Sequence, residues 1–289
     1  MKANRMKKFI ALGLALALTG GVMTACGSSN SSGDSSSKTK VVIAGSTSMQ
    51  PLSEALAKQY MKDNSNVSVE VQGGGSGQGI KSIEDNIADI GSLSRDVDDS
   101  EKSSVDKVYT IAKDGVAVVV NTETTGVSDI TLDELKDVFT GKITNWKDLG
   151  GKDADITVVS REEGSGTREA FTTITGVLVK DSSGNETDNT TSDALVQSST
   201  GAVLKTVKST PDSIGYISLG SLTDSVKALK VDGVSPSEDT VLDGSYEISR
   251  PLIYVTGDST SKAAKAFIKY ALSDAGQKIV EKSGFIPVN

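Results

Sequence analysis

The segment 160-SREEGSGTREAF-171 places a serine between two glycines directly ahead of a helix-forming run, and Arg161 precedes that serine by four residues. Two upstream segments share this character, 45-GSTSMQPL-52 and 73-GGGSGQGIKSI-83. The N-terminus of a helix offers backbone N–H groups that have no intrahelical partner, and it carries a partial positive charge, so it favours anions. Glycines permit close backbone approach, and hydroxyls add hydrogen bonds. Three such turns together predict a site for one small anion.

Each turn also has a simpler interpretation. Ser or Thr at a helix start commonly caps the first turn, and this applies to Thr47 and Ser76. The glycine-rich second turn is equally compatible with a tight strand-to-helix connection. The alternative for Arg161 is a surface salt bridge to one of the nearby glutamates, Glu162, Glu163 or Glu169. The repetition of the turn, with one arginine among its residues, favours the anion site.

Apolar patterns around the turns alternate between strands and helices. Helical spacing predicts one helix that begins with a Thr131–Glu134 capping box and ends near Gly141. It predicts further helices at 52–64, 260–273 and 275–284, and a short one through Ile80 and Ile83. Strands are predicted at 41–45, 67–72, 116–121, 156–161 and 251–257, and 214–220 is predicted to be a short strand or a turn. This alternation is typical of an α/β sheet.

The globular part is long enough for two lobes. We expect the chain to cross between them near 118–122 and again near 245–253. The first lobe would then comprise 41–120 plus 250–289, and the second 121–249. Paired crossings are what a hinged binding protein with a cleft between its lobes requires, although they also occur in proteins that bind nothing.

The N-terminus has the character of an export signal. Four basic residues precede an apolar stretch at 9–22, and 23-MTAC-26 follows. This arrangement resembles the bacterial lipoprotein signal, with Met23 where leucine is usual. We therefore expect a signal peptide at 1–25, a lipidated Cys26, and a flexible tether at 26–40 that holds the protein at the outer face of the cytoplasmic membrane. The alternative is a secretory signal with an incidental cysteine.

Composition excludes several kinds of chemistry. The chain has 289 residues and no histidine, so a Ser-His-Asp triad and a histidine-based zinc site are both absent. Removal of the signal leaves 26 Lys and Arg against 38 Asp and Glu, a net charge of −12, which argues against nucleic acid. Neither the G-x-S-x-G nor the P-loop spacing is met. We expect no enzyme activity, no metal and no cofactor.

The quoted turns belong to a longer series of segments that appears in a fixed order along the chain. The others are 88-ADIGSLSR-95, 139-FTGKITNWKDLGG-151, 214-IGYISLG-220 and 276-GQKIVEKSGFIPV-288. Together they resemble the phosphate-binding lipoproteins of phosphate ABC transporters, the PstS family, in its Gram-positive form. The resemblance implies a two-lobe, type II periplasmic-binding-protein-like α/β fold. It also implies capture of inorganic phosphate in the interlobe cleft and delivery to membrane permease subunits.

The resemblance also implies the residues that bind phosphate. Each lies in one of the three turns, and Arg161 supplies the fixed charge. Ser46 is a further candidate beside the first turn. The implied set is Thr47, Ser48, Ser76, Arg161, Ser165, Gly166 and Thr167.

One position departs from the family pattern. Gram-negative members place an aspartate after the A-D-x-G stretch, where it accepts the proton of bound phosphate. Here Ser94 occupies that place and Arg95 follows. A carboxylate acceptor favours the binding of phosphate over that of sulfate, because sulfate has no proton to donate. Asp114, ahead of the apolar strand near the expected hinge, is our candidate acceptor, although it could equally be a turn residue before Gly115.

Other functions remain open on sequence alone. The nearest is the binding of another tetrahedral oxyanion, such as sulfate or molybdate. An extracytoplasmic hydrolase of phosphate esters would need metal ligands or an activated nucleophile, and no such pattern is visible. An adhesion or sensor protein could also use the same fold.

Overall fold

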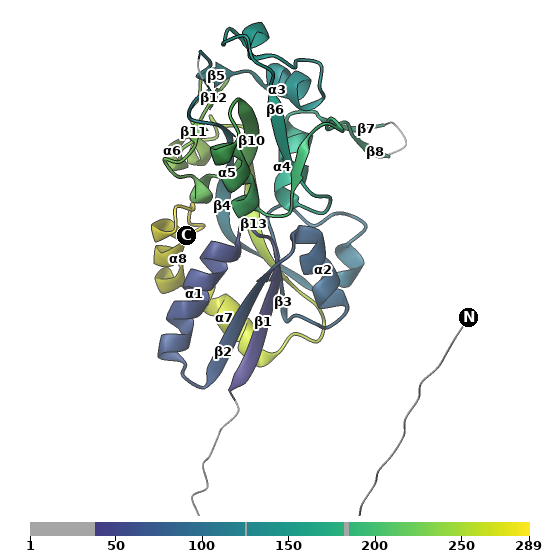
Figure 1. Ribbon diagram of the computed structural model, residues 1–289. Helices are drawn as coiled ribbons and strands as arrows, with labels where there is room; N and C mark the ends of the chain where they lie inside the picture. Colours follow the sequence, from purple (N-terminus) through teal and green to yellow (C-terminus); the bar gives the residue numbers. More distant parts are fainter. Residues whose placement is uncertain (1–37, 125, 182–184) are drawn as a thin grey trace, which may run out of the picture. The chain divides into compact units, whose positions relative to one another are not determined.

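The computed structural model describes residues 38–124, 126–181 and 185–289 (Figure 1). The predicted signal peptide and lipidated Cys26 lie outside these residues. Of the predicted tether, residues 26–37 also lie outside them, whereas Thr39 and Lys40 already belong to the first strand. Within the described part of the chain, no helix combines the length and apolarity needed to cross a membrane.

The main sheet runs in the order β2-β1-β3-β13-β4-β10-β6-β9, and β11 pairs with β4. Strands β1, β2 and β3 are mutually parallel, whereas β13 is antiparallel to both β3 and β4. This mixture of strands and helices confirms the α/β prediction. The strands are β1 Thr39–Gly45, β2 Val67–Gly73, β3 Ile90–Leu93, β4 Lys107–Val120, β6 Thr157–Arg161, β9 Leu195–Gln197, β10 Ser213–Ser218, β11 Lys227–Ala228 and β13 Ser249–Thr256.

Two small ribbons lie outside the main sheet. One pairs β5 (Asp129–Ile130) with β12 (Lys230–Val231) in parallel, and the other pairs β7 (Leu178–Lys180) with β8 (Glu186–Asp188) in antiparallel. Most described residues of the second ribbon are exposed. Figure 1 shows this hairpin extending beyond α4.

The predicted helices are confirmed, with small changes at their ends. Thr131 and Glu134 form the expected capping box of α3, and Gly141 follows its end with a φ of 77°. Two helices, α5 and α6, were not predicted. The helices are α1 Gln50–Asp63, α2 Ser76–Glu84, α3 Leu132–Phe139, α4 Gly166–Ile174, α5 Thr200–Ser209, α6 Glu238–Leu242, α7 Lys262–Ala271 and α8 Asp274–Lys282, with short 3-10 turns at Lys102–Ser104, Trp146–Leu149 and Leu219–Ser221.

Alternate residues of β13 are buried on opposite faces of the sheet. Leu252 and Tyr254 join the core formed by α1, α7 and α8, whereas Ile253 and Val255 pack with α2 and β3. This is the two-residue period expected of a strand that is covered on both sides. Figure 1 shows α1, α7 and α8 on one side of β1 and β2, and α2 on the other.

Near β4 and β13 the chain passes from one hydrophobic core to another. In β4, Ala112 belongs to the core around α1, and Val116 belongs to the core around α3 and β10. The change from one core to the other in β4 thus precedes the predicted crossing at 118–122. On the return, Ile248 and Leu252 belong to different cores, and this change falls within the predicted segment 245–253. The boundaries of the two lobes remain a proposal.

Close backbone packing brings the first two turns together at the ends of β1 and β3. Gly45 has a φ of 136°, and a Cβ built on it would lie 2.2 Å from the carbonyl oxygen of Ser92. Ser46 N donates to that same oxygen at 2.7 Å, and Gly75 N donates to Gly45 O at 2.9 Å. A residue with a side chain at position 45 would therefore separate the turns that carry Thr47 and Ser76.

Candidate anion-binding site

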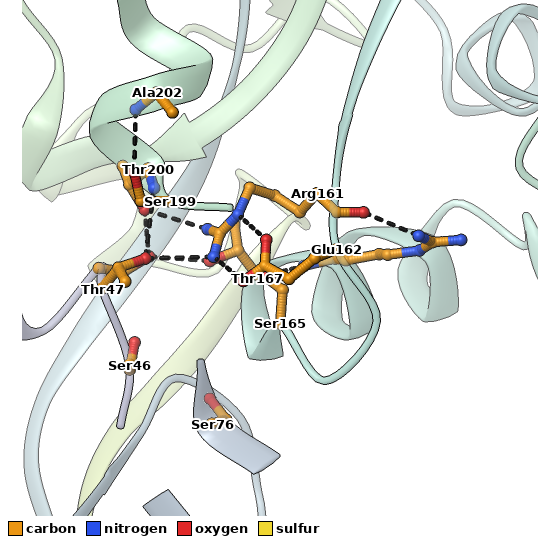
Figure 2. A network of polar contacts seen from close by, with 12 residues as sticks. Ser46, Thr47, Ser76, Arg161, Glu162, Ser165, Thr167, Ser199, Thr200 and Ala202 are labelled. Carbon is orange, nitrogen blue, oxygen red and sulfur yellow. Dashed lines mark hydrogen bonds and ion pairs between the residues drawn. The ribbon is translucent and has the colours of Figure 1, made fainter. Parts of the chain in front are cut away.

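Arg161, at the end of β6, is the centre of a buried polar network (Figure 2). Its side chain is 2% exposed. Nη2 donates to Thr47 Oγ1 at 3.1 Å, and Nη1 donates to Thr200 Oγ1 at 3.2 Å. Nε and Nη2 also donate to the two carboxylate oxygens of Glu162, each at 2.7 Å. The ion pair with Glu162 that the sequence analysis offered as an alternative therefore exists. It is not a surface salt bridge, however, because it orients a buried guanidinium.

Four hydroxyl groups from three elements meet beside Arg161. Ser48 Oγ lies 2.8 Å from both Thr167 Oγ1 and Thr200 Oγ1. Thr47 Oγ1 accepts from the backbone N–H of Thr200 at 3.2 Å. These side chains come from the β1–α1 turn and from the first turns of α4 and α5. Three residues implied by the family resemblance, Thr47, Ser48 and Thr167, are thus brought into contact with Arg161 or with one another.

A second group of the implied residues meets where α2 approaches α4. Ser94 N donates to Ser76 Oγ at 3.1 Å, and the two serine oxygens are 3.5 Å apart. A Cβ built on Gly166 would lie 2.3 Å from Ser76 Oγ. Gly77 N also donates to Gly164 O at 3.1 Å. The second and third turns are therefore in direct contact, and only glycine fits at position 166.

The capping interpretation considered for Thr47 and Ser76 fails for both. Ser46 Oγ accepts from Met49 N at 3.3 Å, and Ser165 Oγ accepts from Arg168 N at 3.3 Å. Ser165 is the N-cap of α4, whereas Ser46 bonds within the turn that precedes α1, and neither bond uses the hydroxyl hydrogen. Neither α1 nor α2 has a side-chain cap. Thr47 and Ser76 therefore serve contacts between elements, as an anion site would require.

Thr200 is the residue that sequence analysis missed. Its hydroxyl and its N–H both join the network around Arg161. A signal was present, because 199-STG-201 precedes a helically spaced apolar run and resembles the other turns. Ser199 caps α5 by accepting from Ala202 N at 3.1 Å, which leaves Thr200 free for other contacts.

Asp114 lies in a different environment from the hydroxyl groups. It is fully buried and faces Arg250 across β4 and β13, with Oδ2 accepting from Nη2 at 3.0 Å and from Nε at 3.3 Å. Burial raises the pKa of Asp114 above its usual range, and Arg250 opposes that rise. Its partner is thus a guanidinium, and its role as a proton acceptor remains a prediction.

Arg95, which is also buried, connects the segment after β3 to α4. Arg95 donates through Nη1 and Nη2 to both carboxylate oxygens of Glu101, each at 2.7 Å, and its Nε lies 2.7 Å from Glu169 Oε2. Burial raises the pKa of Glu169 to about 8, Arg95 opposes the rise, and Asp98 adds to it. The folded protein therefore favours the protonated form of this carboxyl group more strongly than the unfolded chain does.

Comparison with known proteins gives the class. The PBP superfamily domain matches residues 30–275. The chain is 38% identical over 268 residues to the phosphate-binding protein PstS of Bacillus subtilis, covering 90% of this chain and 85% of the relative. It is 32% identical to PstS of Borreliella burgdorferi, covering 86% of this chain and 90% of the relative.

Solved structures agree. One, described as a phosphate ABC transporter substrate-binding protein from Clostridium perfringens with bound phosphate, has a TM-score of 0.80 at 40% identity, covering 86% of this chain and 100% of that one. A phosphate transport receptor from Vibrio cholerae has a TM-score of 0.70 at 33% identity, covering 85% and 99%. The chain belongs to the PBP superfamily and, within it, to the PstS family of phosphate-binding proteins. The predicted family and fold class are thus confirmed.

The raised pKa of Glu169 predicts a pH-dependent stability. An unfolded glutamate titrates near pH 4.5, so between about pH 4.5 and about pH 8 the folded state binds the additional proton. Stability from this group is complete below pH 4.5 and is lost as the pH rises to 8. Glu169→Gln needs no proton, so its melting temperature should fall less over this range than that of the wild type.

The control for this measurement is Glu70→Gln, which removes an exposed carboxylate paired with Lys40. It should follow the wild-type slope. Equal slopes for Glu169→Gln and the wild type would show that Glu169 titrates normally.

Proposed function

We propose that the protein captures inorganic phosphate outside the cytoplasmic membrane and delivers it to the permease subunits of a phosphate ABC transporter. The observation that carries this proposal is the buried guanidinium of Arg161 with hydroxyl groups from three elements around it. Hydroxyls and N–H groups are the donors that an oxyanion requires, and a fixed cation offsets its charge. Membership of the PstS family supports phosphate as that anion.

The proposed ligands are Arg161, the turn hydroxyls and the first N–H groups of α4, which have no intrahelical acceptor. They come from both proposed lobes, since Thr47 and Ser76 belong to the first and Arg161 and Thr167 to the second. The Arg161–Thr47 and Ser48–Thr167 contacts join these lobes. Closure about β4 and β13 would bury the anion and would present one closed surface to the permease. Capture and release need no covalent step, so we propose no enzyme activity.

Another tetrahedral oxyanion remains the second candidate, for a specific reason. The carboxylate beside Arg161 belongs to Glu162, and Arg161 engages both of its oxygens. Ser94 stands where a carboxylate acceptor would discriminate between anions, and a hydroxyl can donate to sulfate as readily as it accepts from phosphate. Selectivity for phosphate over sulfate must therefore be measured.

Titration calorimetry of the full-length chain, purified in detergent and stripped of anion, tests the proposal. We expect one phosphate per chain and weaker binding of sulfate and molybdate. Arg161→Lys keeps the charge but loses the planar fork, so it should weaken phosphate binding by about tenfold to hundredfold. Tight binding of a different oxyanion would change the ligand, and binding of none would refute the proposal.

Asp114→Asn separates two roles for that residue. A proton acceptor would give phosphate an advantage over sulfate that the variant loses. The Arg250 ion pair instead predicts unchanged selectivity and a loss of stability of about 3 kcal/mol, because a buried guanidinium loses its charged partner. The contacts favour the second result. A fall in phosphate preference, measured by the same titration, would make Asp114 the acceptor.

We also propose that Cys26 carries the lipid that retains the protein at the outer face of the membrane. The support is the apolar stretch that ends in small residues just before the chain's single cysteine. Mass spectrometry of the membrane-extracted protein should find an N-terminal, acylated Cys26, and Cys26→Ala should prevent this processing. An unmodified Cys26 in the mature protein would contradict this assignment.

A further inference from the structure

Thr200, in the first turn of α5, takes part in two branches of the hydroxyl network. One branch leads to Thr47, and the other leads through Ser48 to Thr167. Its side chain is buried, its Oγ1 contacts Arg161 and Ser48, and its N–H contacts Thr47. Figure 2 shows it on the far side of Arg161 from Glu162. We propose that Thr200 is a positioning residue that directs the hydroxyl hydrogens of Thr47 and Thr167 toward the bound anion. This inference rests on the proposed phosphate function.

The first branch fixes the hydroxyl of Thr47. A hydroxyl oxygen has two lone pairs and one hydrogen. Thr47 Oγ1 accepts from Arg161 Nη2 at 3.1 Å and from Thr200 N at 3.2 Å, and these two bonds use both lone pairs. The remaining group of Thr47 is its hydrogen, so this hydroxyl can act only as a donor. An oxyanion is an acceptor and therefore matches it.

The second branch reaches Thr167 through two further hydroxyls. The guanidinium can only donate, so Thr200 Oγ1 accepts from Arg161 Nη1 at 3.2 Å. Thr200 can then donate to Ser48, and Ser48 to Thr167, over two contacts of 2.8 Å. Each bond polarises the next, and the positive charge at the start favours this direction. The chain then ends with the hydrogen of Thr167 available to the anion.

The different functions of Ser199 and Thr200 at the start of α5 support this role. Ser199 supplies the side-chain cap, so neither polar group of Thr200 is needed to begin the helix. A purely structural alternative would use Thr200 only to hold α5 against the β1–α1 turn. That alternative predicts effects on stability without a specific loss of anion binding.

The experiment measures phosphate and sulfate affinity by calorimetry, and melting without anion, for full-length variants purified in detergent. Thr200→Val keeps the shape and the N–H but removes the hydroxyl, leaving Arg161 Nη1 and Ser48 Oγ without this partner. Its phosphate affinity should fall by about tenfold to hundredfold. Thr200→Ser should restore binding to within about threefold of the wild type.

Ser199→Ala is the matched control. It removes the cap from the same helix and should lower the melting temperature while leaving phosphate affinity within about twofold of the wild type. A loss of affinity in Ser199→Ala equal to that in Thr200→Val would overturn the inference, because it would trace the effect to the stability of α5. Unchanged affinity in Thr200→Val would overturn it directly.

A double-mutant cycle tests the route through Thr167. If Thr200 acts through that hydroxyl, Thr200→Val combined with Thr167→Val should lose less affinity than the product of the two single losses. Strictly multiplicative losses would contradict the route. If the wild type binds neither phosphate nor sulfate, the proposed function fails and this inference fails with it. If the wild type binds and only the Thr200 results disagree, the proposed function stands.

Discussion

A guanidinium removed from water must find its hydrogen-bond acceptors within the protein, because an unpaired buried charge is strongly destabilising. Arg161 meets this constraint with one carboxylate and two threonine hydroxyls. The carboxylate of Glu162 offsets its charge and fixes its orientation. The hydroxyls do something different, since each accepts from the guanidinium and retains a hydrogen to donate. The cation is thereby connected to a set of outward donors, which is the electrostatic complement of an oxyanion.

The backbone makes this arrangement possible by bringing strand ends and helix starts together. Arg161 ends β6, and Thr47 follows β1, so both lie where a strand gives way to a turn. Gly45 and Gly166 allow backbone approaches that any side chain would block. The chain changes hydrophobic core within β4 and again between Ile248 and Leu252, and the buried Asp114–Arg250 pair joins β4 to β13 at these points. A hinge at these points, as we propose, would change the distance between Thr47 and Arg161 directly.

Local patterns in the sequence predicted most of the elements and a substantial part of the site. The Thr131–Glu134 capping box and the Gly141 stop were readable because they depend on neighbouring residues alone. Strand β4 was predicted to begin at 116, but it begins at Lys107, because polar residues at 113 and 114 interrupt its apolar pattern. Those residues are tolerated in the strand through pairing with β13, a contact between segments that lie far apart in sequence.

Side-chain partners that lie far apart in the sequence could likewise not be predicted from local patterns. Arg161, Thr47 and Thr167 were singled out from their turns, and the structure brings them into one network. Arg250 could not be assigned to Asp114 without the register of β4 and β13. Thr200 lay in a fourth turn of the same kind, but Ser199 beside it is the N-cap of α5, so the turn resembled an ordinary helix cap.

The most direct test of the central claim is a crystal structure of the protein grown with phosphate. The account predicts one tetrahedral anion with oxygens in hydrogen-bond contact with Arg161, Thr47 and Thr167, and with Thr200 bonded to Arg161 behind them. Phosphate bound elsewhere, with the network around Arg161 unchanged and without an anion, would contradict it.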